Sequence, residues 1–419
     1  MIKELNLKNW KSFKDSTLYI DPLTILIGTN ASGKSNLLDA FVFLSRVSAG
    51  VGIFQAINGD VNLPLLRGGM EWVCRKPENQ FSLEILVDGL KASQDYRYSL
   101  TIQINGSKAE VFKEELALLT YGKGNGQPKV NTLFVTKQEE STTPGIPTCF
   151  STGTQGQSRE KLVELNRSHT VLSQTETMNL RKEIQDGTQQ VLSQLKNIFV
   201  FDPIPSHMRD YSSFSETLRA DGSNIAGVLA GIEKESREEL EETLTSYLKK
   251  LPERDIERIW AEPVGKFKTD AMLYCREGWG GDTSHEIDAR GMSDGTLRYL
   301  AIVTALLTRK SKSLLVIEEV DNGLHPSRVQ FLIEMLKTLG KERAIDVIVT
   351  THNPALLDAA GAEMVPFIAV AHRDNHTGIS LLTQLEDIQQ LPKLMAGGSL
   401  GRIATQGRIE AALKSRGNA

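Results

Sequence analysis

Cysteine is scarce in this sequence, and neither sign of charge is in excess. The three cysteines, Cys74, Cys149 and Cys275, are scattered without C-x-x-C spacing. This excludes a disulfide framework and a zinc-finger site, and it favours a reducing cytosol. Lys+Arg number 48 and Asp+Glu 52, for a formal net charge of -4. A protein that coats nucleic acid through a global basic excess is therefore excluded, and any DNA contact is confined to a local patch.

Long apolar runs and targeting segments are also absent. Residues 1–14 alternate apolar side chains with Lys and Asn, which is unlike a signal peptide. No apolar run approaches the length needed to span a membrane, and no solenoid repeat is visible. The chain has 419 residues, 40% of them hydrophobic, enough for two or three domains with a substantial core. We expect a folded cytoplasmic protein that makes no membrane contact.

A phosphate loop is the most informative motif present. Residues 28–35 read G-x-x-x-x-G-K-S between the apolar run 23–27 and the amphipathic segment 36–44. Glycines let consecutive N–H groups face the phosphates, Lys34 reaches the β/γ oxygens, and the Ser35 hydroxyl ligates Mg²⁺. A chance match in an unrelated loop is the alternative, but the flanking strand and helix favour a nucleotide site. The expected ATP-binding residues are Gly28, Asn30, Ala31, Ser32, Gly33, Lys34, Ser35 and Asn36.

Two later strands end in residues suited to phosphoryl transfer. The apolar run 314–317 ends in Glu318 and Glu319, the expected positions of the Mg²⁺-associated acid and of the group that orients attacking water. The run 347–351 ends in His352, which could reach a γ-phosphate. Each pattern is weak alone, because acidic turns often follow strands and a lone histidine is more often structural. Their order and spacing after the phosphate loop strengthen both.

The pattern along the chain predicts an α/β fold in four segments. Three strand-like runs at 80–87, 96–104 and 109–119 predict an antiparallel β lobe, and alternating strands and helices after residue 291 predict a parallel sheet. Residues 121–158, rich in Gly, Thr, Ser, Pro and Gln, predict flexible loops. The expected segments are 1–120 for the first part of the head with its lobe, 121–158 for the loops, 159–265 for an inserted helical subdomain and 266–419 for the second part.

The inserted segment is expected to be helical. Residues 160–195 and 231–260 carry apolar side chains at helical spacing, separated by a short β run at 198–201. The alternating charges of 233–250 could also suit a coiled coil. Sustained heptads are missing, and Pro252 interrupts the pattern, so a solvated helical subdomain is favoured.

In combination, the motifs resemble those of ABC-type ATPases of the SMC and RecF kind, close to the ATPase portion of overcoming-lysogenisation-defect (OLD) proteins. Asn30 and Asn36 match that branch's G-x-N-x-x-G-K-S-N loop. Residues 9–15 resemble its first strand, with Trp10 where a Phe is common. The later matches are the signature motif at 292–298, the Walker B and D-loop run at 318–326, and the switch histidine in 351–354.

The resemblance implies an ABC-type P-loop ATPase head with a mixed or parallel sheet, which forms a homodimer or higher oligomer around ATP and Mg²⁺. Ser293, Asp294 and Gly295 of one head would contact the γ-phosphate on another, although a plain helix N-cap is the alternative for this Ser-Asp pair. Further implied roles are catalysis by Glu319 and His352, Mg²⁺ ligation by Ser35 and Glu318, and a D-loop contact by Asp321. Two features depart from the family: Glu318 replaces the usual Asp, and no Q-loop glutamine is evident among Gln80, Gln138, Gln155 and Gln157.

The segment after His352 predicts strands at 365–372 and 379–382 and then a helical tail. OLD proteins carry a Toprim nuclease after the ATPase, but no Asp-x-Asp is present here. We therefore expect the switch subunit of a prokaryotic antiviral defence or toxin-like system, acting on a separately encoded effector such as a Toprim nuclease.

The alternative is a RecF/SMC-like ATPase of DNA repair or chromosome maintenance. Local basic patches could contact DNA, although a solvated face is the simpler explanation for each; they comprise Lys3, Lys8, Lys11, Lys14 and the region 249–258. A transporter motor is disfavoured by the long insert and the missing Q-loop. A structural relic is disfavoured because the phosphate loop, both carboxylates and the histidine are intact.

Overall fold

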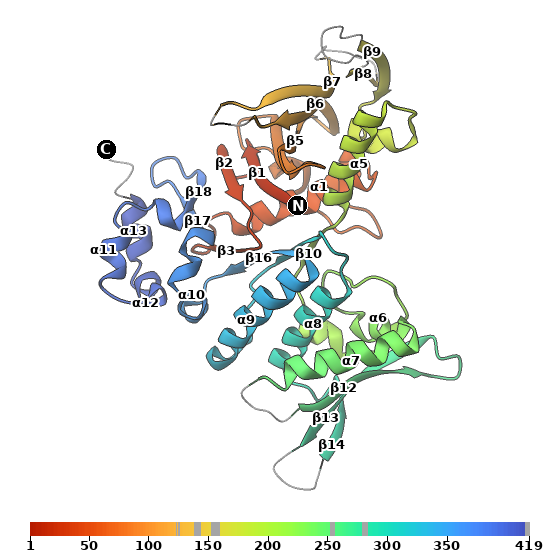
Figure 1. Cartoon of the computed structure of the whole chain (residues 1–419), viewed down its shortest axis with the longest axis vertical. Coiled ribbons are helices and arrows are strands. Elements are labelled where there is room, and N and C mark those ends of the chain that lie inside the picture. Colours follow the sequence, from red (N-terminus) through yellow and green to blue (C-terminus); the bar gives the residue numbers. More distant parts are fainter. Residues whose placement is uncertain are drawn as a thin grey trace.

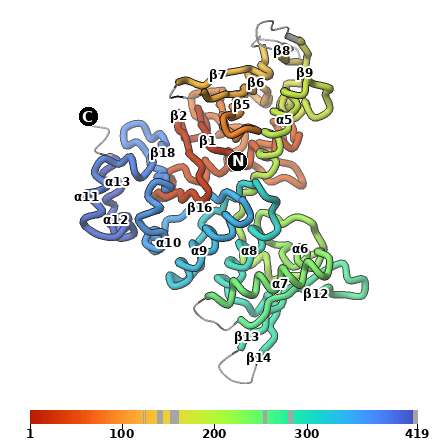
Figure 2. The backbone as a smooth tube through the Cα atoms, in the orientation of Figure 1, coloured from red at the N-terminus to blue at the C-terminus, as the bar shows by residue number. Residues whose placement is uncertain are grey.

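The structure is a computed structural model that describes residues 1–122, 124, 126–137, 144–151, 160–251, 256–278 and 284–414. A central sheet lies between an antiparallel β lobe and a second lobe of helices and strands, and a small C-terminal helical group packs at its side (Figure 1). In Figure 2 the red N-terminal part of the chain lies beside blue segments from the later part of the chain in the centre, while the C-terminal helices lie at the side. The central sheet is therefore assembled from segments far apart in sequence.

The central sheet has six strands in the order β10-β15-β16-β3-β17-β18. Their bounds are β3 (Leu23–Ile27), β10 (Ile198–Phe201), β15 (Leu314–Ile317), β16 (Asp346–Thr351), β17 (Ile368–Arg373) and β18 (Ser380–Gln384). All neighbours pair in parallel except β17 and β18, so the sheet is mixed, as the sequence predicts. The carboxyl ends of the parallel strands meet at one edge, where ligands bind in sheets of this kind.

Helices cover both faces of this sheet and divide its apolar residues between two cores. Leu26 packs with α1 (Lys34–Ser48) and the β lobe, whereas Ile25 and Ile27 pack with α8 (Asp294–Thr308) and α9 (Pro326–Arg343). This alternation follows from the period of two in a strand buried on both sides. The phosphate-loop strand thus lies at the centre of the molecule.

The antiparallel lobe is an eight-stranded sheet in the order β2-β1-β4-β5-β6-β7-β8-β9. The strands are β1 (Ile2–Lys8), β2 (Asp15–Tyr19), β4 (Gln80–Asp88), β5 (Gln94–Asn105), β6 (Lys108–Thr120), β7 (Lys129–Thr136), β8 (Gly145–Ser151) and β9 (Glu160–Asn166). The expectation of loops throughout 121–158 is wrong at β7 and β8. Phe134 and Phe150 face each other across these strands with ring centroids 5.8 Å apart, so burial of aromatic side chains outweighs the loop-like composition.

The segment 159–265 is not purely helical. Helices α5 (Lys182–Lys196) and α7 (Lys234–Leu248) lie in the runs expected to be helical, whereas α6 (Ile225–Gly231) precedes the second run. Strands occupy 160–166 and 256–264. Strand β12 (Ile256–Val264) pairs with β13 (Asp270–Gly278), and Trp260 stacks on Tyr274 at 5.7 Å, so cross-strand pairing overrides the apparent helical spacing. Helix α7 spans 15 residues, and Pro252 lies outside the described residues.

The remaining helices and strands are short. They are α2 (Ile53–Asn58), α3 (Gly69–Trp72), α4 (Val171–Gln174), β11 (Ser212–Ser213), β14 (Ser284–Asp288), α10 (Pro354–Ala360), α11 (Leu391–Met395), α12 (Leu400–Thr405) and α13 (Arg408–Lys414), with four 3-10 turns. The strands and helical tail expected after His352 are present as β17, β18 and α11 to α13. Among the described residues no helix combines the length and apolarity that crossing a membrane requires.

Candidate functional site

The phosphate loop connects β3 to α1 and depends on two glycines. Gly28 has φ 151° and Gly33 has φ 115°, in the range that L side chains rarely adopt. A Cβ at Gly28 would lie 2.2 Å from the carbonyl oxygen of Ala371, and one at Gly33 would lie 2.7 Å from Ser380 Oγ. Backbone conformation and close packing thus both require glycine, and the loop can curl around a small anion.

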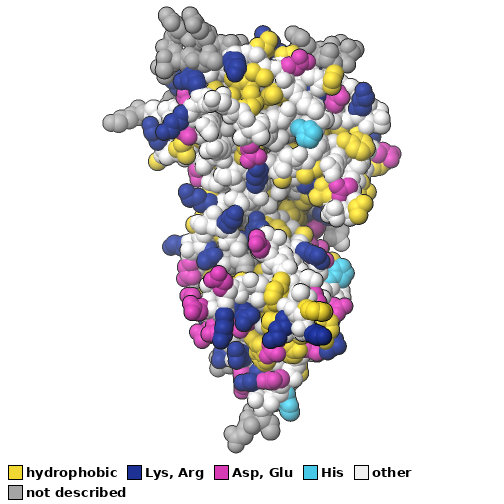
Figure 3. Space-filling model, turned by 90° about the vertical axis from the view of Figure 1, so that its right-hand side faces the viewer, with side chains coloured by type: hydrophobic (Ala, Val, Ile, Leu, Met, Phe, Trp, Pro, Cys, Tyr) yellow, Lys and Arg dark blue, Asp and Glu magenta, His cyan; other side chains and the backbone are white. Residues whose placement is uncertain are grey.

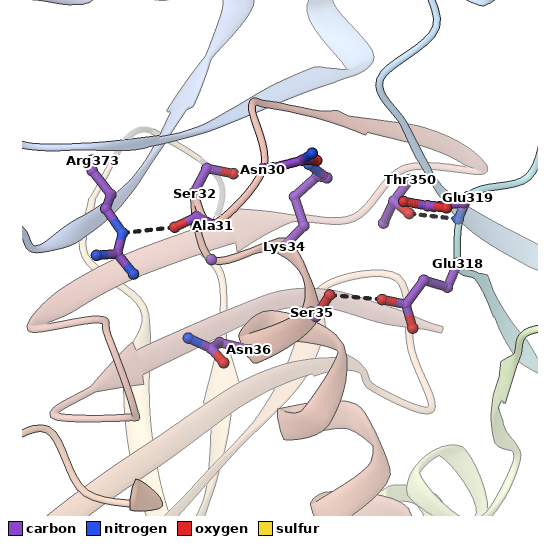
Figure 4. A pocket seen from close by; sticks show the side chains of 11 residues that line it. Asn30, Ala31, Ser32, Lys34, Ser35, Asn36, Glu318, Glu319, Thr350 and Arg373 are labelled. Carbon is purple, nitrogen blue, oxygen red and sulfur yellow. Dashed lines mark hydrogen bonds between the residues drawn. The ribbon is translucent and has the colours of Figure 1, made fainter. Parts of the chain in front are cut away.

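The cradle contains polar atoms suited to phosphate. Ser32 Oγ is buried and has no hydrogen-bond partner among the described residues. Lys34 Nζ donates to the carbonyl oxygens of Gly28 at 2.6 Å and Thr29 at 3.1 Å, bonds that phosphate oxygens could replace. Burial lowers the pKa of Lys34, and the carboxylates of Glu319 and Glu318 oppose that shift. A cavity of about 290 Å³ opens above the loop, as Figure 4 shows from close by. The unpaired Ser32 hydroxyl and the Lys34 ammonium that line this cavity fit a nucleotide's phosphates.

Ser35 and Glu318 meet at the floor of this cavity. Ser35 Oγ donates to Glu318 Oε1 at 2.7 Å, which joins the first turn of α1 to the end of β15 (Figure 4). Hydroxyl and carboxylate oxygens are the ligands that Mg²⁺ prefers, and Mg²⁺ on phosphates commonly has only one or two protein ligands. The pair therefore fits the Mg²⁺ site expected from the sequence.

Arg67 makes a contact at this site that the sequence did not indicate. Its Nη1 and Nη2 donate to Glu318 Oε1 and Oε2 at 3.1 and 3.2 Å, while its Nε donates to Asp39 at 3.0 Å. Burial raises the pKa of Glu318, but bonds from Arg67 and Ser35 outweigh it, so the pKa lies below its ordinary value. Nothing in the spacing of a lone arginine after α2 could have marked it.

Glu319 lies beside the phosphate loop in an unusual backbone conformation. Its φ is 46°, in the left-handed region that non-glycine residues seldom occupy. The Thr350 hydroxyl accepts its N–H at 2.8 Å, and the Nδ1 of His352 lies 3.8 Å from Glu319 Oε1. The two residues expected to act in catalysis are therefore brought together, at the ends of adjacent parallel strands. Such strained positions concentrate at functional sites.

The expected signature residues lie outside this cavity. Ser293 is the N-cap of α8 and accepts the N–H of Thr296 at 3.1 Å, while Asp294 accepts a 2.5 Å bond from Arg209. Neither they nor Gly295 line the cavity above the phosphate loop, nor does Asp321, which is buried. The geometry meets the plain N-cap alternative.

Arg298 links the signature helix to the carboxylate turn. This buried residue of α8 donates through Nη1 to the Pro203 carbonyl at 2.7 Å and through Nη2 to the carbonyls of Glu318 and Glu319, each at 2.9 Å. Asp202, which follows β10, lies 3.4 Å from the same guanidinium. Arg298 ends the signature motif at 292–298, but the motif assigns it no role of its own, because its partners are backbone atoms of distant segments.

The asparagines of the phosphate loop differ in what they contact. Asn30, Ala31 and Asn36 all line the cavity, but Asn36 Nδ2 donates to Ser12 Oγ at 2.7 Å and so fixes the loop against the first hairpin. Of the glutamines considered for a Q-loop, Gln80 begins β4 in the antiparallel lobe; Gln138, Gln155 and Gln157 lie outside the described residues.

Comparisons with known proteins agree with this geometry. Residues 23–128 and 275–358 match the family model described as "AAA domain, putative AbiEii toxin, Type IV TA system". An "ATP/GTP phosphatase" of Helicobacter pylori (strain ATCC 700392 / 26695) is 23% identical over 382 residues, covering 85% of this chain and 87% of that protein. A solved SMC head bound to the C-terminal winged-helix domain of ScpA superposes with a TM-score of 0.53 at 16% identity, covering 91% of this chain and 97% of the other. The chain therefore has the P-loop ATPase fold of an SMC-type head.

Proposed function

We propose that this protein binds and hydrolyses ATP at the cavity above its phosphate loop. The observation that carries the proposal is the bond between Ser35 and Glu318, which joins the phosphate loop to the carboxylate turn beside Glu319. The phosphatase name of the Helicobacter relative and the AAA family match support a nucleotide-hydrolysing activity.

In the proposed reaction each residue has a defined task. Lys34 and the loop N–H groups bind the phosphates, Glu319 orients the attacking water and accepts its proton, and His352 contacts the γ-phosphate. Mg²⁺, held by Ser35 and Glu318, would neutralise charge on the phosphates. Thr350 fixes the backbone of Glu319, so its carboxylate is positioned before nucleotide arrives.

Dimerisation around ATP is the second part of the proposal. The N-terminus of α8, where Ser293 and Gly295 lie, is a ready anion site outside its own cavity. In a head-to-head dimer it would cover the γ-phosphate held by the partner, with Asp321 at the same interface. ATP would then join two heads, and hydrolysis would release them.

We infer for this cycle the role of a switch in a cytoplasmic prokaryotic defence or toxin-like system, acting on a separately encoded effector such as a Toprim nuclease. The supporting observation is the family match, whose description names an AbiEii toxin and a type IV toxin-antitoxin system. Nucleotide-dependent opening and closing of the dimer would expose or cover the effector's binding surface.

Contact with DNA is the competing role, supported by the SMC-type fold alone. Two of the lysines considered for it are engaged elsewhere: Lys3 pairs with Asp88 and Asp95, and Lys11 is buried against Asp39. In the face shown in Figure 3, Lys and Arg side chains are interspersed with Asp and Glu, without a continuous basic patch. The effector-switch role is therefore preferred.

The test has two measurements, both with ATP and Mg²⁺. One is the rate of ATP hydrolysis by the purified chain, and the other is its mass in solution, alone and co-expressed with its operon neighbours. Glu319→Gln should retain ATP, lose hydrolysis by on the order of 10²–10⁴-fold and accumulate as a dimer. Glu342→Gln, an exposed change on α9, is the matched control. A wild-type protein that neither hydrolyses ATP nor dimerises would contradict the proposal. Dimers that capture duplex DNA but no neighbour protein would move the role to DNA maintenance.

A further inference from the structure

The hairpin of β12 and β13 ends in an exposed turn that takes no part in the cavity above the phosphate loop. Residues 265–269, the hairpin tip, read Gly-Lys-Phe-Lys-Thr, and all five are exposed. Phe267 is 83% exposed, more than any other aromatic side chain that the structure describes. The hairpin extends away from the central sheet in Figure 1, and Figure 3 views the molecule from that side. An aromatic ring is thus presented to solvent at the end of a projecting hairpin.

The residues of the hairpin tip are not those that the turn itself favours. Lys268 has φ 53°, in the left-handed region that glycine adopts without strain. In the β5–β6 and β17–β18 hairpins a glycine takes this conformation, at Gly106 (φ 59°) and Gly378 (φ 67°). Glycine and short polar residues would form the turn more readily, so the choice of Phe267 between two lysines needs another explanation.

The base of the hairpin tip is fixed by β11. Ser213 Oγ donates to Asp270 Oδ1 at 2.7 Å, and the Phe214 N–H donates to the Thr269 carbonyl at 3.0 Å. Val264 and Asp270 are paired in the antiparallel ladder, so the two strands are held together up to the first residue of the tip. Phe214 is itself 42% exposed. A partner would therefore meet a preformed aromatic surface, and binding would cost little entropy for ordering it.

Two lysines flank the exposed ring. Lys266 Nζ lies 6.0 Å from the centre of the Phe267 ring. Neither Lys266 nor Lys268 forms an ion pair within the part of the chain that the structure describes, whereas Arg276 on the stem of the hairpin is paired with Glu286. The hairpin tip therefore carries two positive charges without a counter-charge, on either side of one apolar ring.

This combination fits a protein pocket better than a broad anionic surface. A lipid bilayer or a nucleic-acid duplex would cover more than the tip, and it would also meet Glu262 and Asp270 on the hairpin and Glu216 after β11. An apolar pocket encloses the ring alone, and acidic side chains at its rim would meet the two lysines. Buried aromatic rings contribute strongly to interfaces of this kind. The charges and the apolar ring therefore favour a protein partner that has an apolar pocket with an acidic rim.

The stem of the hairpin is connected to the signature motif. Strand β13 pairs with β14, and residues 289–292 lead from β14 into α8. Arg209, which precedes β11, donates through Nη1 to the carbonyls of Ala289, Arg290 and Met292 at 2.9, 3.0 and 2.7 Å. The segment that fixes the hairpin tip is therefore bonded to the turn that begins α8. A partner held at the tip would be attached to the part of the head that the proposed dimer brings against nucleotide.

We propose that the hairpin tip is the docking site for the separately encoded effector: Phe267 enters an apolar pocket of that protein, and Lys266 and Lys268 bind acidic side chains at the rim of the pocket. The inference rests on the proposed effector-switch role and names the surface that would serve it. Because no residue of the tip lines the cavity above the phosphate loop, docking leaves the proposed ATP-binding residues free.

The affinity for the operon neighbour, measured calorimetrically with ATP and Mg²⁺, tests the docking site. The neighbour protein would be titrated with wild type, Phe267→Ser and the control Leu90→Ser, which removes a 58% exposed apolar side chain from the β4–β5 turn. Phe267→Ser should weaken binding on the order of 30-fold, as expected for the loss of an aromatic anchor. Leu90→Ser should bind like wild type, and the rate of ATP hydrolysis by the chain alone should be the same in all three.

Charge reversal tests the rim of the pocket. The double variant Lys266→Glu, Lys268→Glu should also weaken binding, and the affinity of wild type should fall as the salt concentration rises. Lys108→Glu, an exposed change in the β5–β6 hairpin, should leave the affinity unchanged.

Equal affinity of the neighbour for wild type and Phe267→Ser would overturn the docking site and leave the effector-switch role in place. A wild-type protein that hydrolyses ATP but binds no operon neighbour would overturn both. Binding to phosphatidylserine vesicles or to a DNA duplex that Phe267→Ser abolishes would assign the hairpin tip to another class of partner and overturn the proposal.

Photocrosslinking tests the same contact while an aromatic ring is kept at the hairpin tip. With p-benzoylphenylalanine at position 267 and the operon neighbours co-expressed, we expect crosslinked peptides of the neighbour protein that contain both apolar and acidic residues. Crosslinks confined to a second copy of this chain would overturn the proposal.

Discussion

At the scale of single residues, Glu318 has more partners than a free magnesium ligand would have. Arg67 covers both of its oxygens, and Ser35 donates to one of them. The same carboxylate cannot accept all of these bonds and also bind a cation at full strength. Arg67 therefore both keeps Glu318 ionised and competes for it.

Replacing Arg67 should shift the pH dependence of ATP hydrolysis. The pKa of Glu318 is below its ordinary value because the bonds from Arg67 and Ser35 outweigh burial. In Arg67→Ala the bonds from Arg67 no longer oppose the effect of burial on Glu318. The pKa of Glu318 should therefore rise, and the acid limb of the kcat/KM profile should move to higher pH. Arg75→Ala, an arginine between α3 and β4, should leave the profile unchanged. An unshifted acid limb in Arg67→Ala would show that Glu318 does not control it.

At the scale of elements, hydrogen bonds from Arg298 link α8 to the segments that follow β10 and β15. Arg298→Ala leaves three carbonyl groups without this donor, and we expect a loss of about 3 kcal/mol in the free energy of unfolding by denaturant titration. Arg298→Lys keeps the charge but not the fork of donors, so it should fold with a smaller loss and still reduce kcat. Equal kcat in the lysine variant and wild type would contradict a role in positioning Glu319.

A buried carboxyl joins β6 to α4 and should make stability depend on pH. Glu114 accepts the N–H groups of Val171 and Leu172 and the hydroxyl of Tyr98, and burial raises its pKa from 4.5 to about 7. The folded state therefore holds this proton up to about pH 7, while the unfolded chain releases it near pH 4.5. The free energy of unfolding should fall between those values as pH rises, by on the order of 3 kcal/mol.

The measurement is urea denaturation from pH 5 to 8 for wild type and Glu114→Gln. The variant should lose much of the slope, although not all of it, because burial also raises the pKa of Asp346 to about 7 and acts with the same sign. A wild-type stability that rises across this interval would show that Glu114 is ionised in the folded protein.

The sequence predicted the elements whose signals are local. The phosphate loop, the strands near 80–120 and the strand-helix alternation after residue 291 follow from glycine spacing and hydrophobic period, and all are present. The prediction from sequence was wrong where pairing with a distant strand determines the secondary structure, as at β7, β8 and β12. Arg67 and Arg373, which donates a hydrogen bond to the phosphate loop, were missed for the same reason, and Arg298 was placed in the signature motif without its contacts, because the partners of all three lie in other segments. The local amino-acid composition of a segment does not indicate whether it will be buried against a distant strand.

At the scale of the whole molecule, the separation of Ser293 from its own cavity allows a mixing test of the proposed dimer. Lys34→Ala inactivates the phosphate loop of one subunit, and Ser293→Arg blocks the signature of the other. In a two-fold dimer the mixed pair retains one site with both parts intact. Equal mixing of two inactive variants should therefore restore about a quarter of wild-type ATPase activity, since half of the dimers are mixed and each has one of two sites. No recovery on mixing would mean that Ser293 acts within its own subunit or only as a cap.

The place of β3 in the central sheet also determines when the protein can become active during its synthesis. This early strand lies between β16 and β17, which come from the last fifth of the chain. At about 5–20 residues per second a ribosome takes roughly a quarter of a minute to a minute to reach them. Until then the phosphate loop has no neighbouring strands to hold its shape, and a nascent or prematurely released chain has no nucleotide site. Translation thus acts as a delay, and only a chain that has been read through to β17 can complete the proposed nucleotide site.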